Sequence, residues 1–451
     1  MEFSATVILA GLILALLWLF SVKRRKYRLP PGPAPLPLLG NLPQIDKNAP
    51  FKSILKFSEN YGPVMTLYMG RQRTVVLVGY DAVKEALVDQ ADDFTGRMPV
   101  PFLLKATKGY GLGISNGERW RQMRRFTLTT LRDFGMGRKG MEEWIQEVKL
   151  RKNGSFSKPF DPQFLLSSTV SNVICCLVFG ERFSFEDKQF LHLLTIMSKV
   201  TRFNSSPLGQ MYNIFPWLMD HLLDFIERKI QEHKETLDPS SPRGYIDCFL
   251  IRINQEKNNP SSEFNYDNLI STVLNLFVAG TETTSYTLRH ALTVLIKYPK
   301  IQGSLFVDLK LGNRCPRMDD RKSLPFSDAV IHEVQRFLDI VPFSDTVIIP
   351  LLHSVLKEEK QWATPRFFNP QHFLDHNGNF KKNPAFMPFS AGKRACVGES
   401  LARMELFIFL VSLLQDFSFS CEGGPDSVDL DPEYSSFANL PRTYQLIATA
   451  R

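Results

Sequence analysis

One cysteine of this chain lies in a turn that a purely structural cysteine would not need. Cys396 belongs to the segment 386–407, FMPFSAGKRACVGESLARMELF, and the other residues at fixed spacing there are Phe389, Gly392, Arg394 and Gly398. Glycines permit a turn with positive φ and let a bulky group approach the backbone. A helical pattern follows at once, so Cys396 lies near a helix N-terminus, a position that lowers a thiol pKa and favours thiolate.

A thiolate in such a turn serves as a nucleophile or as a metal ligand. A nucleophile needs a histidine base, and none is near in the sequence, although folding could supply one. Arg394 offers paired N–H donors to a carboxylate instead. A flat ligand that carries both a metal and carboxylates would use both residues, and haem is such a ligand. The alternative is a cysteine buried in the core, and the match at all five positions argues against it.

The segment 386–407 resembles the haem-binding loop of cytochrome P-450, the haem-thiolate monooxygenases, and the similarity extends over the whole chain. Within this superfamily the chain is most similar to the vertebrate microsomal family 2, and there to the fish 2K-type subfamily. The resemblance implies a fold that is mainly α with small β-sheets, preceded by an N-terminal transmembrane helix. It also implies haem b as cofactor, with Cys396 as the axial ligand whose thiolate favours O–O cleavage.

The longest helical pattern contains AGTETT, residues 279–284. A threonine within a helix usually donates a hydrogen bond back to the carbonyl four residues earlier, which is the ordinary interpretation of this one. Beside a haem cysteine, a glycine and a threonine can open a groove for dioxygen. The resemblance then assigns oxygen activation and proton relay to Glu282 and Thr283. The expected substrate pocket includes Ala279, Val341 and Phe437.

The pair Glu333 and Arg336, in EVQR, lies on one face of a predicted helix. An exposed ion pair of this kind would contribute little to stability. The resemblance implies instead that the pair is buried and holds a meander loop, and so the haem loop, through His372 in NPQHF.

The motif WRQMR places Trp120 and Arg124 four residues apart. They are either part of a basic helix surface or, by the resemblance, partners of the haem propionates together with Arg394.

The net charge of +8 and the pI of about 9.0 suit anionic membranes or acidic proteins, and no nucleic-acid motif is present. The resemblance implies NADPH-cytochrome P-450 reductase as the electron donor, cytochrome b5 as a further partner, and a small apolar substrate. Five basic residues have two interpretations: they form a positive face that binds the reductase, or they form a solvated charged surface. These residues are Arg121, Arg125, Arg132, Lys393 and Arg403.

The N-terminus has the pattern of a membrane anchor. Residues 3–21 form an uncharged run that is long enough to span a bilayer, and KRRK follows at 23–26. A cleaved signal peptide is the alternative, but its charges would precede the apolar run. We therefore expect a transmembrane anchor at 1–22, in the endoplasmic reticulum membrane, with the catalytic domain in the cytosol. A basic and proline-rich linker is expected at 23–50, and the haem domain at 51–451.

The remaining patterns place these residues on elements. A β-hairpin is predicted from strands at 64–69 and 74–78, and a last strand at 443–450. Helices are predicted at 116–131 with Asn116 as its cap, at 160–180, at 268–298 and, with an amphipathic pattern, at 325–340.

Several segments depart from the family pattern. After Ser344 the chain passes directly to DTVIIPLL, where family members have short strands, and further shortened or altered segments begin at 146, 219 and 303. Loss of a central strand is expected to leave ladder groups unpaired. Two functions stay open: a monooxygenase acting on fatty acids, steroids or xenobiotics, and a non-catalytic or poorly haem-binding relative that lacks a sheet strand after Ser344.

Overall fold

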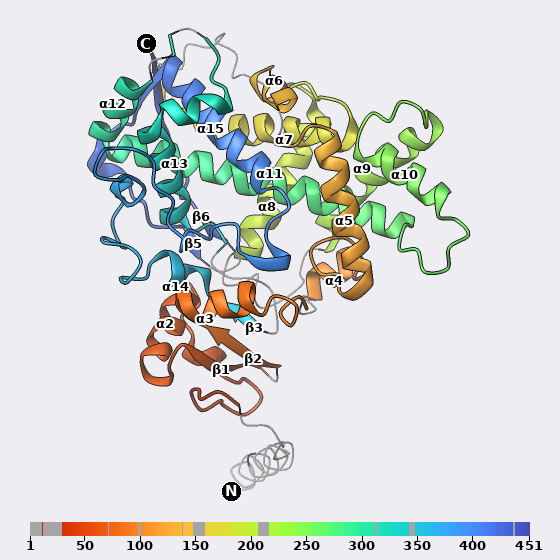
Figure 1. Ribbon diagram of the computed structural model, residues 1–451, viewed down its shortest axis with the longest axis horizontal. Coiled ribbons are helices and arrows are strands. Elements are labelled where there is room, and N and C mark those ends of the chain that lie inside the picture. The colour runs from red at the N-terminus through yellow and green to blue at the C-terminus, as the bar shows by residue number, and fades with distance from the viewer. Residues whose placement is uncertain are drawn as a thin grey trace, which may run out of the picture.

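The computed structural model shows a mainly helical protein with small sheets, as predicted (Figure 1). It describes residues 11, 29–70, 72–97, 101–137, 139–147, 158–205, 216–309, 311–312, 314–341, 348–435 and 438–451. The predicted anchor at 1–22 lies outside these residues, except for Gly11. Within the described part of the chain, no helix has the length and apolar character needed to cross a membrane.

The helices follow one another along most of the chain. They are α2 (Pro50–Tyr61), α3 (Tyr80–Lys84), α4 (Pro101–Thr107), α5 (Gly117–Asp133), α6 (Lys139–Glu147), α7 (Gln163–Phe179), α8 (Lys188–Ser205), α9 (Pro216–Glu235), α10 (Tyr245–Gln255), α11 (Tyr266–Lys297), α12 (Pro299–Asp308), α13 (Pro325–Leu338), α14 (Leu352–Leu356) and α15 (Glu399–Asp416). Single turns of other helix types are η1 (Leu42–Gln44), η2 (Glu85–Asp89), η3 (Met318–Ser323), η4 (Pro370–Phe373), η5 (Gly392–Arg394) and η6 (Pro425–Ser427).

The strands form three small sheets. They are β1 (Val64–Met69), β2 (Gln72–Leu77), β3 (Ile348–Pro350), β4 (Phe417–Ser420), β5 (Tyr434–Ser435), β6 (Asn439–Leu440) and β7 (Ile447–Ala450). Strand β4 pairs with β7 and β5 with β6, both antiparallel. The last predicted strand is therefore present, although it is shorter than expected.

The core lies between α7, α11 and α15, whose central residues are mostly apolar and buried, although α11 and α15 also bury Glu282, Arg289, His290 and Glu405. Figure 1 shows α11 passing through the middle of the helical part. Helix α7 ends where predicted, because Gly180 adopts the left-handed conformation at φ 68° and a Cβ there would collide with the carbonyl of Arg243. Helix α13 was predicted from an amphipathic pattern, but it has no face exposed to solvent. The elements η4, α11 and α15 pack against it, and nearly every one of its residues is buried.

The predicted hairpin is present, with Val64 paired to Leu77 and Met69 to Gln72. Strand β3 then adds to β2 in parallel, from Val75 opposite Ile348 to Leu77 opposite Pro350. The expectation that the segment missing after Ser344 leaves ladder groups unpaired stays a prediction, because this pairing covers only three of the six residues of β2. The chain just beyond the shortened segment supplies the partner strand. Residues 342–347 themselves lie outside the described residues.

The segment predicted as an extended linker is partly folded onto β1. The amide of Thr66 donates to Pro31 O over 2.9 Å, and Asn41 is fully buried, with its Oδ1 accepting from the amide of Tyr68 over 2.7 Å. The prolines exclude helix, as expected, but the buried amide of Asn41 fixes the path of the chain. The hairpin, α2 and α14 lie together at one end of the described part of the chain, the lower end in Figure 1.

Candidate active site

The two glycines of the turn before α15 predicted positive φ angles, but only one of the two adopts a positive φ. Gly392 has φ 71°, and a Cβ there would overlap the carbonyl oxygen of Leu87, so no other residue fits. Gly398 has φ −93° and contributes differently, because its N–H donates to the Cys396 thiol. The amide of Cys396 donates to Phe389 O over 3.0 Å, which closes the turn.

The Cys396 thiol lies three residues before the first residue of α15, yet the expected lowering of its pKa is wrong. Burial against the surrounding protein raises the pKa above its ordinary value, and this outweighs the opposing effects of the Gly398 N–H and the Arg124 charge. The Cys396 side chain is nevertheless open to solvent, so a ligand can approach it.

Two predicted arginines converge beside this cysteine. Arg124 donates to Ala395 O over 2.6 Å, and Arg394 donates to Thr95 O and Ser115 O over 2.7 Å each. Arg394 also lies over the buried ring of Trp120, 3.9 Å from its centroid. The structure thus brings Trp120, Arg124 and Arg394 together at the Cys396 loop.

Sequence analysis missed Arg97, whose charge acts on Arg394. Burial, together with the neighbouring charges of Arg97 and Arg124, lowers the pKa of Arg394 to about 9. Asn116 is the N-cap residue of α5, as predicted, but its side chain makes no capping hydrogen bond and instead accepts from the amide of Arg97 over 2.6 Å and from Arg394 over 3.3 Å. Arg97 follows a Thr-Gly pair in a loop and carries no helical or strand periodicity that could have marked it.

The AGTETT segment forms an accessible stripe on the otherwise buried α11. Ala279 is exposed and Gly280 and Thr283 are half-buried, although most residues on either side of them are buried. This part of α11 is therefore more accessible than the rest of the helix, except at Gly280, where a Cβ would lie 2.5 Å from Ile174 Cδ1 of α7. The hydroxyl of Thr283 donates to Ala279 O over 2.8 Å, the local bond that an ordinary helical threonine makes.

Glu282 points in another direction, into the protein. It is 5% exposed, and its carboxyl has the hydroxyls of Tyr286 and Thr201 beside it. Burial raises the pKa of Glu282 to about 7, against the lowering effect of these two hydroxyls and of Arg289. Such a carboxyl is close to half-protonated at neutral pH, which suits a group that exchanges protons.

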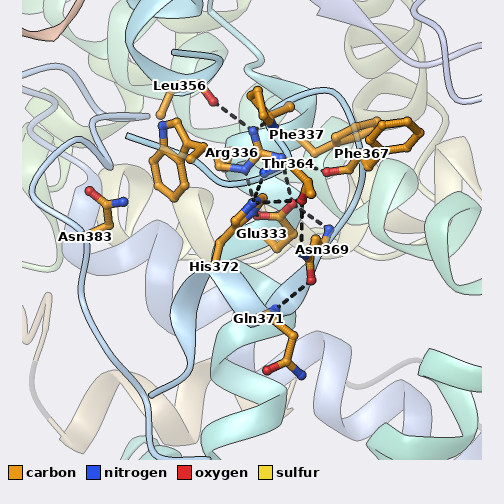
Figure 2. Close-up of polar contacts among 12 residues, drawn as sticks. Glu333, Arg336, Phe337, Leu356, Thr364, Phe367, Asn369, Gln371, His372 and Asn383 are labelled. Carbon is orange, nitrogen blue, oxygen red and sulfur yellow. Dashed lines mark hydrogen bonds and ion pairs between the residues drawn. The ribbon is translucent and has the colours of Figure 1, made fainter. Parts of the chain in front are cut away.

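The pair in EVQR is fully buried, and His372 reaches it (Figure 2). Arg336 binds both carboxylate oxygens of Glu333 over 2.7 Å each, and His372 Nδ1 lies 3.1 Å from Glu333 Oε2. The remaining N–H groups of Arg336 donate to carbonyl oxygens of the loop between α14 and η4; these belong to Leu356, Pro365 and Phe367. The three side chains therefore connect α13 to the meander.

Val341 follows α13 and is half-buried. Phe437, the other residue expected in the pocket with Ala279, lies outside the described residues.

Known proteins match this chain over nearly its whole length. The family model of cytochrome P450 matches residues 30–448. The chain is 46% identical to cytochrome P450 2G1 of Oryctolagus cuniculus over 487 residues, with 99% of each protein covered. The chain belongs to the cytochrome P450 family. It is also 46% identical to cytochrome P450 2A4 of Mus musculus (99% of this chain, 98% of the relative) and to cytochrome P450 2F2 of Rattus norvegicus (94% and 95%).

These relatives place the chain in cytochrome P450 family 2, and so among the haem-dependent monooxygenases, which are oxidoreductases. The family uses a haem-thiolate cofactor and a reductase as redox partner, and its microsomal members indicate the endoplasmic reticulum membrane. The comparison also supports the predicted shortening. The match to 2G1 extends over 487 positions whereas this cytochrome P450 has 451 residues, so at least 36 positions, the difference, have no counterpart here.

The residues present fit a haem. The half-buried Arg394 donates only to carbonyl and amide oxygens among the described residues, so it carries a charge that a ligand carboxylate would neutralise. An accessible thiol lies beside it, and a metal would stabilise the thiolate that burial alone disfavours. The site thus supplies one iron ligand and nearby cations for carboxylates.

Proposed function

We propose that this cytochrome P450 inserts one oxygen atom of O2 into a small apolar substrate, so that RH, O2, two electrons and two protons give ROH and H2O. The observation that carries the proposal is the open Cys396 thiol grouped with Arg124 and Arg394. Haem b, held by Cys396, would supply the iron at which O2 is bound and cleaved.

The residues around Cys396 have distinct parts in holding the cofactor. Arg124, Arg394 and Trp120 would bind the propionates, because they present charge and N–H donors next to the loop. Phe389, Gly392 and Gly398 would keep the thiol in place, through the hydrogen bonds to Phe389 O and from the Gly398 N–H and through the close approach at Gly392. Glu333, Arg336 and His372 would act at a distance, by fixing the meander.

Glu282 and Thr283 would deliver protons during oxygen activation. Thr283 lies with Ala279 on the accessible part of α11, and the adjacent Glu282 has a carboxyl that can both give and take a proton near pH 7. Thr283 would position the proton at the reacting oxygen, while Glu282 would restore it from the protein interior.

The substrate class is proposed from the family and from the apolar composition of the chain. The chain has 36 phenylalanines, and an apolar pocket with Ala279, Val341 and Phe437 would accept fatty acids, steroids or xenobiotics. The test is to supply NADPH-cytochrome P-450 reductase, with and without cytochrome b5, and a panel of these substrates under isotopically labelled O2. Hydroxylated product that carries one labelled oxygen supports the proposal, and labelled product from none of the three classes contradicts it.

The domain at 23–451 would face the cytosol from an endoplasmic reticulum anchor at 3–21. Within family 2, we further propose that the chain belongs with the fish 2K-type subfamily. Exposed leucines at the end nearest the N-terminus fit a lipid surface there; they are Leu36, Leu38, Leu39 and Leu42. Protease added outside sealed microsomes should remove the domain, and its protection would refute this topology.

The alternative of a non-catalytic relative is weakened by the partial pairing of the sheet. It rested on an unpaired sheet after Ser344, but β3 pairs with three residues of β2, from Val75 to Leu77.

A further inference from the structure

A buried histidine joins α13 to the helix that follows the cysteine loop. His332 is 4% exposed, and its Nδ1 lies 2.7 Å from Asp328 O, one turn earlier on α13. Its Nε2 lies 2.9 Å from Nη1 of Arg403, on the second turn of α15. The ring also packs against Phe386, the first residue of the segment 386–407, with the centroids 4.9 Å apart.

These partners fix the form of the imidazole ring. The Asp328 carbonyl can only accept a hydrogen bond, and the Arg403 guanidinium can only donate one. His332 therefore carries its hydrogen on Nδ1 and presents the electron pair of Nε2 to Arg403, as a neutral ring. The Asp328 carboxylate, 3.2 Å from Nδ1, needs no charge from the ring, because Arg321 binds it with three hydrogen bonds of 2.8–3.0 Å.

Arg403 continues the connection to both ends of the turn that holds Cys396. Its Nε and Nη2 lie 3.0 and 2.9 Å from Oε1 of Glu399, the first residue of α15. Its guanidinium also lies over the Phe389 ring, 5.3 Å from the centroid, and the Phe389 carbonyl accepts from the amide of Cys396 over 3.0 Å. One guanidinium thus contacts the residue that closes the turn and the residue that begins the helix after it.

The acceptor at His332 determines where this guanidinium lies. The Arg403 side chain is 21% exposed and that of Glu399 41%, so an ion pair between these two alone would be partly solvated and would contribute little. Without His332 Nε2, the Arg403 Nη1 donor would turn to water. The Glu399 charge disfavours a thiolate at Cys396, and a guanidinium held beside Glu399 offsets that charge.

We propose that His332 is a positioning residue for the cysteine ligand: by accepting from Arg403 it holds the guanidinium between Glu399 and Phe389, and so keeps the Cys396 turn closed. This inference rests on the proposed role of Cys396 as the iron ligand. His332 contacts neither substrate nor cofactor in this account, and its whole effect passes through Arg403.

The variants His332→Gln and His332→Met separate the acceptor from the volume of the ring. Glutamine can place its carbonyl oxygen where Nε2 lies, whereas methionine fills a similar volume and offers only a weak thioether acceptor. The first measurement is amide hydrogen exchange of the segment 386–407 by mass spectrometry, in the full chain and without turnover. Exchange of peptides that contain the Cys396 amide should be about fivefold faster in His332→Met and close to wild type in His332→Gln.

The second measurement is the carbon-monoxide difference spectrum of the reduced protein at matched haem content. The thiolate-type spectrum should be lost about fivefold faster on incubation in His332→Met than in the wild type or His332→Gln. His290→Met is the matched control. His290 on α11 is 2% exposed and stacks on Phe337 of α13, but its Nε2 has no hydrogen-bond partner among the described residues. Both rates should match the wild type in this variant.

Wild-type exchange of the segment in His332→Met overturns the proposal, even if that variant melts earlier. Equal acceleration in His332→Gln, or in His290→Met, also overturns it, because the ring's packing and not its acceptor would then hold the turn. If His332→Met does not fold, Arg403→Met decides, since it removes the matching donor and should accelerate exchange equally. A protein that forms no labelled product refutes the proposed function, whereas the exchange measurement still tests the position of the turn.

Discussion

At the scale of single residues, Glu282 and Thr283 are neighbours in the sequence that face different surroundings. Thr283 lies on the accessible part of α11, whereas Glu282 is buried against Tyr286 and Thr201. The sequence predicted both as candidates, but the depth of Glu282 depends on α8, which no spacing along α11 encodes.

Thr283→Ala should uncouple the enzyme: peroxide should increase and product per NADPH should fall several-fold, because the proton is no longer positioned at the reacting oxygen. The measurement is peroxide, product and NADPH in one reaction. Thr287→Ala is the control, because Thr287 donates to Thr283 O over 2.8 Å in the same local bond one turn on. Equal loss in the two variants would mean that Thr283 acts only as a helix residue.

The buried Glu282 also predicts a pH dependence of stability. Its folded pKa of about 7 lies above the ordinary 4.5, so between these values the folded state holds a proton that the unfolded state releases. The contribution of Glu282 to stability is therefore present below pH 4.5 and lost as pH rises through 7, by about 3 kcal/mol in total. Glu282→Gln should flatten this part of the curve of unfolding free energy against pH. Curves that fall in parallel would contradict the assignment.

At the scale of elements, the Arg336 fork fixes the loop between α14 and η4. Arg336 has no exposed surface and binds Glu333 on one side and three loop carbonyls on the other. The sequence predicted the pair from its spacing, but the carbonyls carry no sequence signal. Only the path of the folded chain brings them within reach.

Arg336→Gln should lower the unfolding free energy by about 3–5 kcal/mol, since it leaves Glu333 buried and unpaired. Denaturant unfolding measures this. Arg121→Gln, in the exposed pair with Glu118 at 3.5 Å, is the control and should change stability by less than about 1 kcal/mol. If the two substitutions cost the same, the fork does not hold the meander.

Periodicity predicted the elements whose neighbours lie close in sequence, such as the β1–β2 hairpin, α7 up to Gly180 and most of α11. Periodicity failed where a segment distant in the sequence determines the pairing or the hydrogen bonds. Residues that follow the shortened segment after Ser344 pair with β2. The side chain of Asn116 accepts hydrogen bonds from Arg97 and Arg394 rather than from the amides of its own helix. In the site, the Cys396 loop was predictable from its glycines, but the raised thiol pKa depends on burial that only the fold creates.

At the scale of the whole molecule, this cytochrome P450 keeps its core and its cysteine loop although at least 36 positions of the alignment to 2G1 are missing. Insertion after Ser344 of the segment that a full-length relative carries should raise both the melting temperature and the haem-to-protein ratio. The reason is that β3 pairs with β2 over only three residues, and each added hydrogen bond contributes roughly 0.5–1.5 kcal/mol. Unchanged values would mean that β3 alone replaces the missing strands.

The central claim is that Cys396 holds haem iron as a thiolate. The most direct measurement is the carbon-monoxide difference spectrum of the reduced protein, recorded for the wild type and for Cys396→Ser at matched haem content. We predict a thiolate-type spectrum for the wild type and its complete loss in Cys396→Ser. A thiolate-type spectrum that persists in Cys396→Ser, or a haem-loaded wild type without one, would contradict the account.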